Sequence, residues 1–139
     1  MSEVRVTAES TAPPHKVTAL LADGQSWPDW SPIGEAWIDK QSDEVVGEVR
    51  RFKTGRTVSI EEVVAFEPGR RLQYRLVEGL PLRDYLSTIY VEYVDGGSAI
   101  TWHSTFEARR PGTGGIYRWM LRRFLQDMVD GLAKAAAAE

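Results

Sequence analysis

The sequence contains no cysteine and no run of apolar residues long enough to form a transmembrane helix. The absence of cysteine excludes disulfides, thiolate metal sites and a cysteine nucleophile. Residues 1–11, MSEVRVTAEST, also lack the apolar core of a signal peptide. We therefore expect a cytoplasmic protein without stable membrane insertion.

The chain also has no excess of positive charge. Its 17 basic and 20 acidic residues give a formal net charge of −3, so no global positive field is available to attract nucleic acid, and we expect no nucleic-acid partner. A chain of 139 residues that is 42% hydrophobic and 27% charged has the size and composition of one globular domain. We expect a single domain over residues 1–139, and these features leave the oligomeric state open.

Histidine is nearly as scarce as cysteine, with His15 and His103 only. Two histidines spaced four residues apart on a helix, the spacing typical of a zinc site, do not occur. The sequence also lacks a Gly-x-Ser-x-Gly elbow, a phosphate-binding glycine loop and a dinucleotide fingerprint. We therefore expect no metal and no cofactor.

What the sequence does contain is a series of strand signals. Apolar and polar residues alternate from Val4 to Ser10, which predicts a strand with one buried face. A short helix is expected after Pro13-Pro14, ending at Asp23-Gly24. From residue 34 to 106, turn signals recur about every dozen residues, which leaves no room for crossover helices and predicts antiparallel hairpins.

A long amphipathic helix is predicted over about 116–137. Its apolar residues recur at steps of three and four along one face: Tyr117, Met120, Leu121, Phe124, Leu125, Met128 and Leu132. The predicted fold class is α+β. It consists of a curved antiparallel sheet of about six to seven strands, two short helices after the first strand, and the long C-terminal helix laid across the inner face of the sheet.

Several short motifs, taken in order, resemble one known family. They are Trp27-Pro28-x-Trp30-x-Pro32, Gly47-x-Val49-Arg50, Glu61-Glu62-Val63 followed by Glu67-Pro68, then Tyr74, Gly79-x-Pro81, Asp95-Gly96-Gly97 before a strand with Trp102, and Gly131-Leu132. Together they resemble the polyketide cyclase/dehydrase-like and START-like lipid-transfer proteins of the SRPBCC superfamily. The resemblance covers nearly the whole chain and implies the helix-grip fold, in which a cavity lies between the sheet and the long helix.

The resemblance leaves three functions open, because one fold hosts many activities. The first is binding of a small hydrophobic or aromatic molecule, such as a lipid or polyketide-like metabolite, in the cavity. The second is a polyketide cyclase or dehydratase that uses Tyr, Ser and Glu side chains there. The third is a protein-interaction domain that uses the Trp-rich segment 26–32 as an exposed patch. The same segment has two further interpretations, as a core anchor or as a lining of the cavity mouth.

Strand parity and the helix stripe identify the candidate ligand contacts. Side chains two residues apart share one face of a strand, which groups Tyr85 with Ser87 and Trp102 with Ser104 and Phe106. The full candidate set is Trp30, Tyr74, Tyr85, Ser87, Trp102, Ser104, Phe106, Met120, Phe124 and Met128. His103 has the opposite parity to Trp102, so we expect it to face away from the cavity.

One acidic residue is a candidate for catalysis. With Thr54-Gly55 as the turn of a hairpin, Arg50 and Glu61 are diagonal neighbours on one face and form an ion pair. Val49, Val58 and Ile60 occupy the other face, and alternation then points Glu62 inward with them. A carboxyl among apolar neighbours has a raised pKa, so Glu62 is the candidate general acid or base, unless a bulge at the Glu-Glu step reverses the two faces.

Overall fold

The computed structural model describes residues 1–138. Its strands are β1 (Ser2–Ser10), β2 (Glu35–Lys40), β3 (Val49–Thr54), β4 (Thr57–Glu67), β5 (Arg71–Glu78), β6 (Leu82–Val94) and β7 (Gly97–Ala108). Its helices are α1 (Pro14–Ala22), the short 3₁₀ helix η1 (Gly24–Ser26), α2 (Trp27–Trp30) and α3 (Gly114–Ala137). The predicted order of elements is confirmed, and α3 begins two residues before the predicted start.

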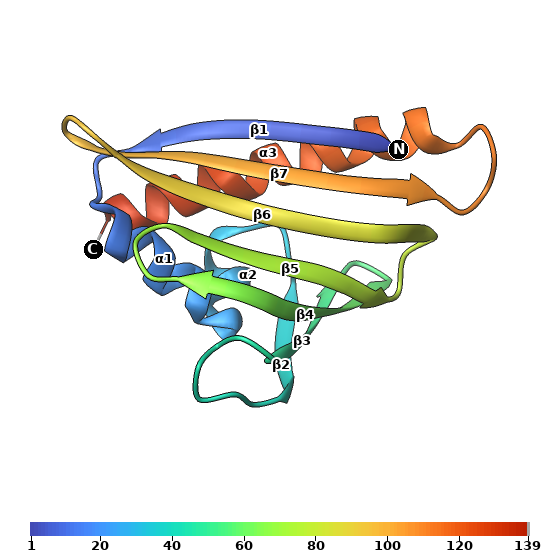
Figure 1. Ribbon diagram of the computed structural model, residues 1–139, viewed down its shortest axis with the longest axis horizontal. Helices are drawn as coiled ribbons and strands as arrows, with labels where there is room; N and C mark the ends of the chain where they lie inside the picture. The colour runs from blue at the N-terminus through green and yellow to red at the C-terminus, as the bar shows by residue number, and fades with distance from the viewer. Residues whose placement is uncertain (139) are drawn as a thin grey trace.

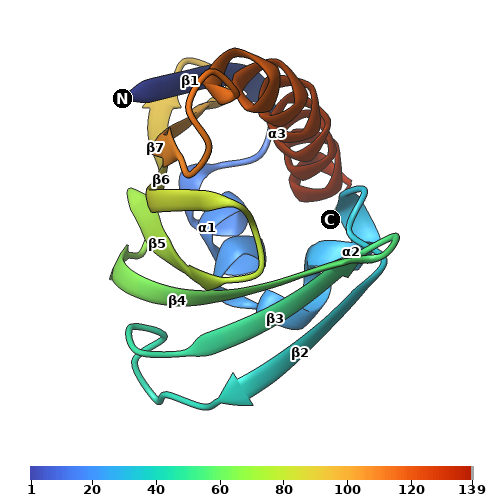
Figure 2. The ribbon, with the colours of Figure 1, turned by 90° about the vertical axis from the view of Figure 1, so that its right-hand side faces the viewer.

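The strands form one sheet in the order β1-β7-β6-β5-β4-β3-β2 (Figure 1). Every neighbouring pair is antiparallel, and consecutive strands from β2 to β7 pair with each other as hairpins. The first strand, β1, lies at one edge of the sheet and pairs with the last strand, β7. In Figure 2 the sheet curves from β1 at the top to β2 at the bottom, and α3 runs along the side that the curve leaves open. This is the predicted helix-grip fold.

The C-terminal half of α3 anchors the helix on the sheet. Leu125, Met128 and Leu132 are fully buried on its inner face, as the three- and four-residue spacing predicts. At Gly131 the helix passes so close to α2 that a Cβ atom there would lie 1.7 Å from the carbonyl oxygen of Trp30. The first turns of α3 are different, because Ile116, Trp119 and Met120 are exposed there.

The Trp-rich segment forms the corner between α1 and β2, and it anchors the core. Trp27 and Trp30 are 1% and 7% exposed. The indole of Trp27 stacks on Phe52 at 5.0 Å between ring centroids and donates a hydrogen bond to the Leu21 carbonyl. The indole of Trp30 donates to the Ser26 hydroxyl. The expectation of an exposed aromatic patch here is wrong, because both rings are packed against the sheet and the indole N–H groups have internal acceptors.

Within residues 1–138, no helix combines the length and the apolar character needed to cross a bilayer.

Candidate functional site

A pocket of about 490 Å³ lies between the inner face of the sheet and α3. Its walls come from β3, β4, β5, β6, the β5–β6 loop, α2 and α3. The lining residues are Trp27, Ile33, Phe52, Thr54, Thr57, Ser59, Glu61, Tyr74, Gly79, Leu80, Pro81, Leu82, Tyr85, Tyr117, Met120, Leu121, Phe124, Leu125 and Met128. A strongly bent sheet and a straight helix leave such a space because they cannot stay in contact along their whole length.

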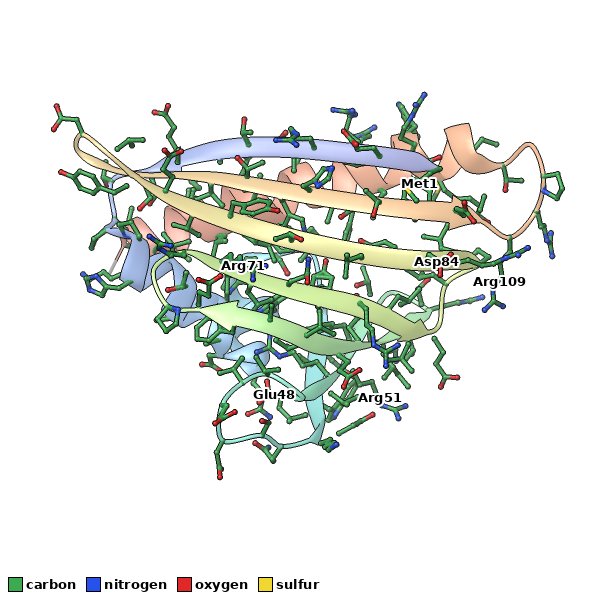
Figure 3. The ribbon with its side chains drawn as sticks, viewed as in Figure 1. Met1, Glu48, Arg51, Arg71, Asp84 and Arg109 are labelled. Atoms are coloured by element: carbon green, nitrogen blue, oxygen red, sulfur yellow. The ribbon has the colours of Figure 1, made fainter. Side chains whose placement is uncertain are left out.

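The mouth of the pocket is defined by the lining residues that are exposed. These are Thr57 beside the β3–β4 turn, Gly79 and Pro81 in the β5–β6 loop, and Met120 in the first turns of α3. The start of β6 and the end of β7 lie at this end of the sheet, where Figure 3 labels Asp84 and Arg109. The pocket therefore opens beneath the part of α3 that is least anchored to the sheet.

A β-bulge helps to form the wall near the mouth. The pairing of β6 with β7 shifts between Arg83 and Leu86, and Asp84 adopts a left-handed conformation with φ 52°. Asp tolerates this conformation better than most residues. Tyr85, the other residue within the bulge, points into the pocket and packs against Tyr74, with 6.3 Å between the ring centroids.

Five of the ten predicted ligand contacts line the pocket, namely Tyr74, Tyr85, Met120, Phe124 and Met128. Four others, Ser87, Trp102, Ser104 and Phe106, are fully buried outside its lining. Strand parity placed these four on the correct face, but the expectation that they border the cavity is wrong because they pack against the aromatic wall.

The contacts of these four residues define a layer behind the wall. Trp102 donates a hydrogen bond to the Tyr74 hydroxyl, Phe106 stacks on Tyr85, and the Ser87 and Ser104 hydroxyls bond to each other at 2.5 Å. This layer holds the two tyrosine rings in place. The tenth residue, Trp30, borders a separate shallow groove beside Gly131 and Lys134.

The acidic residue that faces the pocket is Glu61, and the prediction that Glu62 points inward is wrong. The hairpin turn is Gly55-Arg56, with Thr54 paired to Thr57, so Arg50 lies directly opposite Glu61 rather than diagonal to it. Thr57, Ser59 and Glu61 face the pocket. The apolar residues Val58 and Ile60 lie on the outer face. In this part of β4 the polar side chains therefore face inward and the apolar ones outward, the reverse of the pattern expected for a strand over a packed core.

Glu62 lies on the outer face of the sheet, where it forms an ion pair with Arg75 at 2.6 Å. Its carboxylate is therefore separated from the pocket by the backbone of β4. In the sequence, Glu61 can be distinguished from Glu62 by the polar residues at the alternate positions 57, 59 and 61. Polar side chains on the inner face of a curved sheet indicate a space that the core does not fill.

The Glu61 carboxyl group is buried, with a residue exposure of 9%. Among residues 1–138, it has no hydrogen-bond partner in the protein. Burial raises its pKa from 4.5 to about 8, and the nearby Arg50 charge offsets this only in part. The carboxyl group is therefore mostly protonated at neutral pH and can exchange its proton within the physiological range.

Arg50 is a structural residue despite its position beside the pocket. Its guanidinium binds the Glu48 carboxylate at 2.7 Å and donates to the carbonyls of Leu21 and Ala22, at the C-terminal end of α1. It also lies over the Trp27 ring, 5.6 Å from the centroid. Cations are favoured at this end of a helix, and the close packing needs Gly24, where a Cβ would lie 2.6 Å from the Arg50 Nε. Burial lowers the pKa of Arg50, and the hydrogen bond to Glu48 counteracts that shift.

The hydroxyl groups of Tyr74 and Tyr85 stay protonated through the neutral range. The pKa of Tyr74 is raised mainly by burial, and further by Tyr85 and by Glu61. Burial also raises the pKa of Tyr85, with a second contribution from Glu61. At these two positions of the pocket wall, the protein thus presents neutral hydrogen-bonding groups rather than fixed charges.

No metal centre is formed by the part of the chain that the structure describes, because it contains no group of three His, Asp or Glu side chains placed to hold an ion. His103 lies on the outer face of β7, opposite to Trp102, where its Nε2 is 3.4 Å from the Glu3 carboxylate. This confirms the prediction that His103 faces away from the cavity.

The sequence matches the family described as "Polyketide cyclase / dehydrase and lipid transport" over residues 1–137. The chain belongs to this family. The match confirms the resemblance inferred from the motifs. Among curated proteins, none matches the chain.

Solved structures agree on the fold. The protein XoxI from Bacillus cereus is 24% identical and superposes with a TM-score of 0.80, covering 97% of this chain and 95% of its own. A START superfamily protein from Mycobacterium smegmatis is 17% identical, with a TM-score of 0.84 and coverages of 98% and 97%. The Zhui aromatase/cyclase from a Streptomyces species is 19% identical, with a TM-score of 0.79 and coverages of 97% and 93%. At these identities the similarity establishes the helix-grip fold alone.

Proposed function

We propose that this protein binds a small, mainly apolar molecule in the pocket between the sheet and α3. The pocket itself carries the proposal. A volume of about 490 Å³ lies in the range of small-molecule sites, and Phe52, Leu82, Leu125 and Met128 give the walls an apolar character. A few polar groups, Glu61, Tyr74 and Tyr85 among them, are placed to orient the bound molecule.

The family description, which includes lipid transport, supports this proposal. So does the mouth, because the first turns of α3 expose Met120 beside the opening and are the part of the helix with the fewest buried residues. Movement of these turns would admit a ligand without breaking the core around Leu132.

The test is native mass spectrometry of the freshly purified protein, followed by denaturation and solvent extraction. We expect an additional mass that disappears on denaturation. We also expect that fatty acids, sterols or aromatic polyketides, tested as a panel, include compounds that raise the melting temperature. A bare chain together with no thermal shift from any compound would contradict the proposal.

A second candidate function is catalysis of the cyclase or dehydratase type, with Glu61 in the role first assigned to Glu62. The favouring observation is a carboxyl group on the pocket wall whose pKa is about 8. In its ionised form, such a group can remove a proton from carbon next to a carbonyl, and the protonated form that results can give the proton to the carbonyl oxygen. The similarity in fold to an aromatase/cyclase also supports this second candidate function.

Two variants separate binding from catalysis. If the protein is an enzyme, Glu61→Gln retains ligand binding but loses product formation from a poly-carbonyl substrate. Glu62→Gln is the matched control, because that carboxylate lies on the outer face with Arg75, and we expect it to leave turnover unchanged. Equal turnover in both variants would eliminate Glu61 as the acid or base.

A further inference from the structure

We propose that Glu61 is the recognition group of the pocket and that the ligand is an uncharged apolar molecule whose carbonyl oxygen accepts a hydrogen bond from the Glu61 carboxyl group. This inference rests on the proposed function, since it names the class of ligand for the same pocket.

The first argument is that the carboxyl group lacks a partner. Among the described residues that line the pocket, Glu61 is the only Asp, Glu, Lys, Arg or His. Its carboxyl group makes no hydrogen bond within residues 1–138. Among residues 1–138, His103 Nε2 is the only fully buried side-chain nitrogen or oxygen without a hydrogen-bond partner, so the Glu61 oxygens are not sealed in the core. They border the pocket instead, where a ligand atom can form a hydrogen bond with the carboxyl group.

The second argument is that no cation is free to neutralise the group. Arg50 faces it from β3, but the guanidinium is held by Glu48 and by two carbonyls at the end of α1. The remaining titratable groups around the pocket are Tyr74 from β5, Tyr85 from β6 and Tyr117 from α3. The other residues that α3 brings to the lining are apolar.

These surroundings decide which ligand groups fit. Burial raises the pKa of Glu61 to about 8, so at neutral pH its carboxyl group has an O–H that can donate a hydrogen bond to a ligand. A ketone, ester or amide oxygen accepts that bond at no cost in charge burial. A ligand carboxylate would place a second acidic group beside Glu61 in a site without an available cation, which is unfavourable.

Four naphthalene compounds of similar shape test the proposal by calorimetry at pH 6. They are 2-acetylnaphthalene, 2-ethylnaphthalene, 2-naphthoate and 1-(2-naphthyl)ethylamine. We expect the ketone to bind about tenfold more tightly than the hydrocarbon, as one hydrogen bond to a buried group implies, and the carboxylate to bind most weakly. The amine supplies the opposite charge and is expected to bind more weakly than the ketone.

The pH dependence of ligand affinity distinguishes a hydrogen bond to Glu61 from a fit of shape alone, because shape does not change with pH. Between pH 6 and pH 9 the protonated fraction of Glu61 falls, so wild-type affinity for the ketone is expected to decrease by about tenfold. Glu61→Gln keeps a hydrogen-bond donor that does not titrate, and should bind the ketone with little pH dependence. Glu61→Leu should bind the ketone and the hydrocarbon equally. Glu62→Gln is the control and should keep the wild-type pH profile.

The possible failures are distinct. If the ketone and the hydrocarbon bind equally and the wild type shows no pH dependence, the role of Glu61 is overturned while ligand binding stands. If the amine binds most tightly, the site recognises a cation and the proposed ligand class is wrong. If neither these compounds nor the broader apolar panel binds at any pH, both the proposed function and this inference fail.

Discussion

Arg50 and Glu61 face each other directly across the β3–β4 ladder, yet only Arg50 has its polar groups satisfied within the protein. The guanidinium joins β3 to Glu48 and to the end of α1, whereas the carboxyl group opposite it borders an apolar pocket. Arg50 thus holds the helical corner on the sheet, whereas the Glu61 carboxyl group lies on the pocket wall.

Removal of the Arg50 side chain should destabilise the fold strongly. Arg50→Ala leaves the Glu48 carboxylate and two helix-terminal carbonyls without their donor in a buried site, and we expect a loss of about 3–5 kcal/mol in the free energy of unfolding. Arg51→Ala is the control in the neighbouring position. Arg51 pairs with Asp39 on the exposed face, so its loss should be below about 1 kcal/mol in denaturant titrations. Equal losses in the two variants would contradict the structural role of Arg50.

Stability should depend on pH through Glu61. Because the folded-state pKa is raised from 4.5 to about 8, the folded protein retains a proton that the unfolded chain has already released. The Glu61 contribution therefore lowers stability as pH rises from about 4.5 to about 8, by at most about 1.4 kcal/mol per pH unit. Glu61→Gln lacks this contribution, so its stability relative to wild type should increase over that range. Parallel pH profiles from urea unfolding of the two proteins would rule out the raised pKa.

Two glycines in α3 should respond to alanine in opposite directions. At Gly131 a Cβ would lie 1.7 Å from the Trp30 carbonyl oxygen, so Gly131→Ala pushes α2 away from α3 and should cost about 1–3 kcal/mol or more. At Gly115 a Cβ meets no other atom within 4 Å. Gly115→Ala should therefore raise stability by up to about 1 kcal/mol, because alanine favours the helix. Thermal unfolding of both variants checks the contrast, which a stabilising Gly131→Ala would refute.

Filling the pocket should separate stability from binding. Ser59 points into the pocket from β4, and Ser59→Phe places an apolar ring in that space. We expect a melting temperature equal to or above that of wild type, since the ring buries apolar surface in an unfilled volume, and at least about tenfold weaker binding of any apolar ligand. Ser59→Thr adds little volume and serves as the control. Unchanged ligand affinity in Ser59→Phe would place the binding site elsewhere.

The sequence by itself determined the order of elements and the fold. Periodicity located α3 to within two residues of its start, and the spacing of turn signals required an antiparallel sheet, because these patterns are local consequences of burying one face of each element. Strand parity also placed Tyr74 and Tyr85 on the inner face correctly.

Only the tertiary structure decided which acid faces the pocket. The rule that apolar residues point inward assumes that the inner face is packed, and it selected Val58, Ile60 and Glu62. Along this part of β4 the inner face borders a cavity, so Thr57, Ser59 and Glu61 lie inside and the apolar side chains lie outside. Strand parity also could not predict that Trp102 and Phe106 lie behind the pocket wall. Parity gives the face of the sheet on which a side chain lies, but not which other residues cover it. The distance between the curved sheet and α3 determines both outcomes, and that distance depends on contacts between residues far apart in the chain.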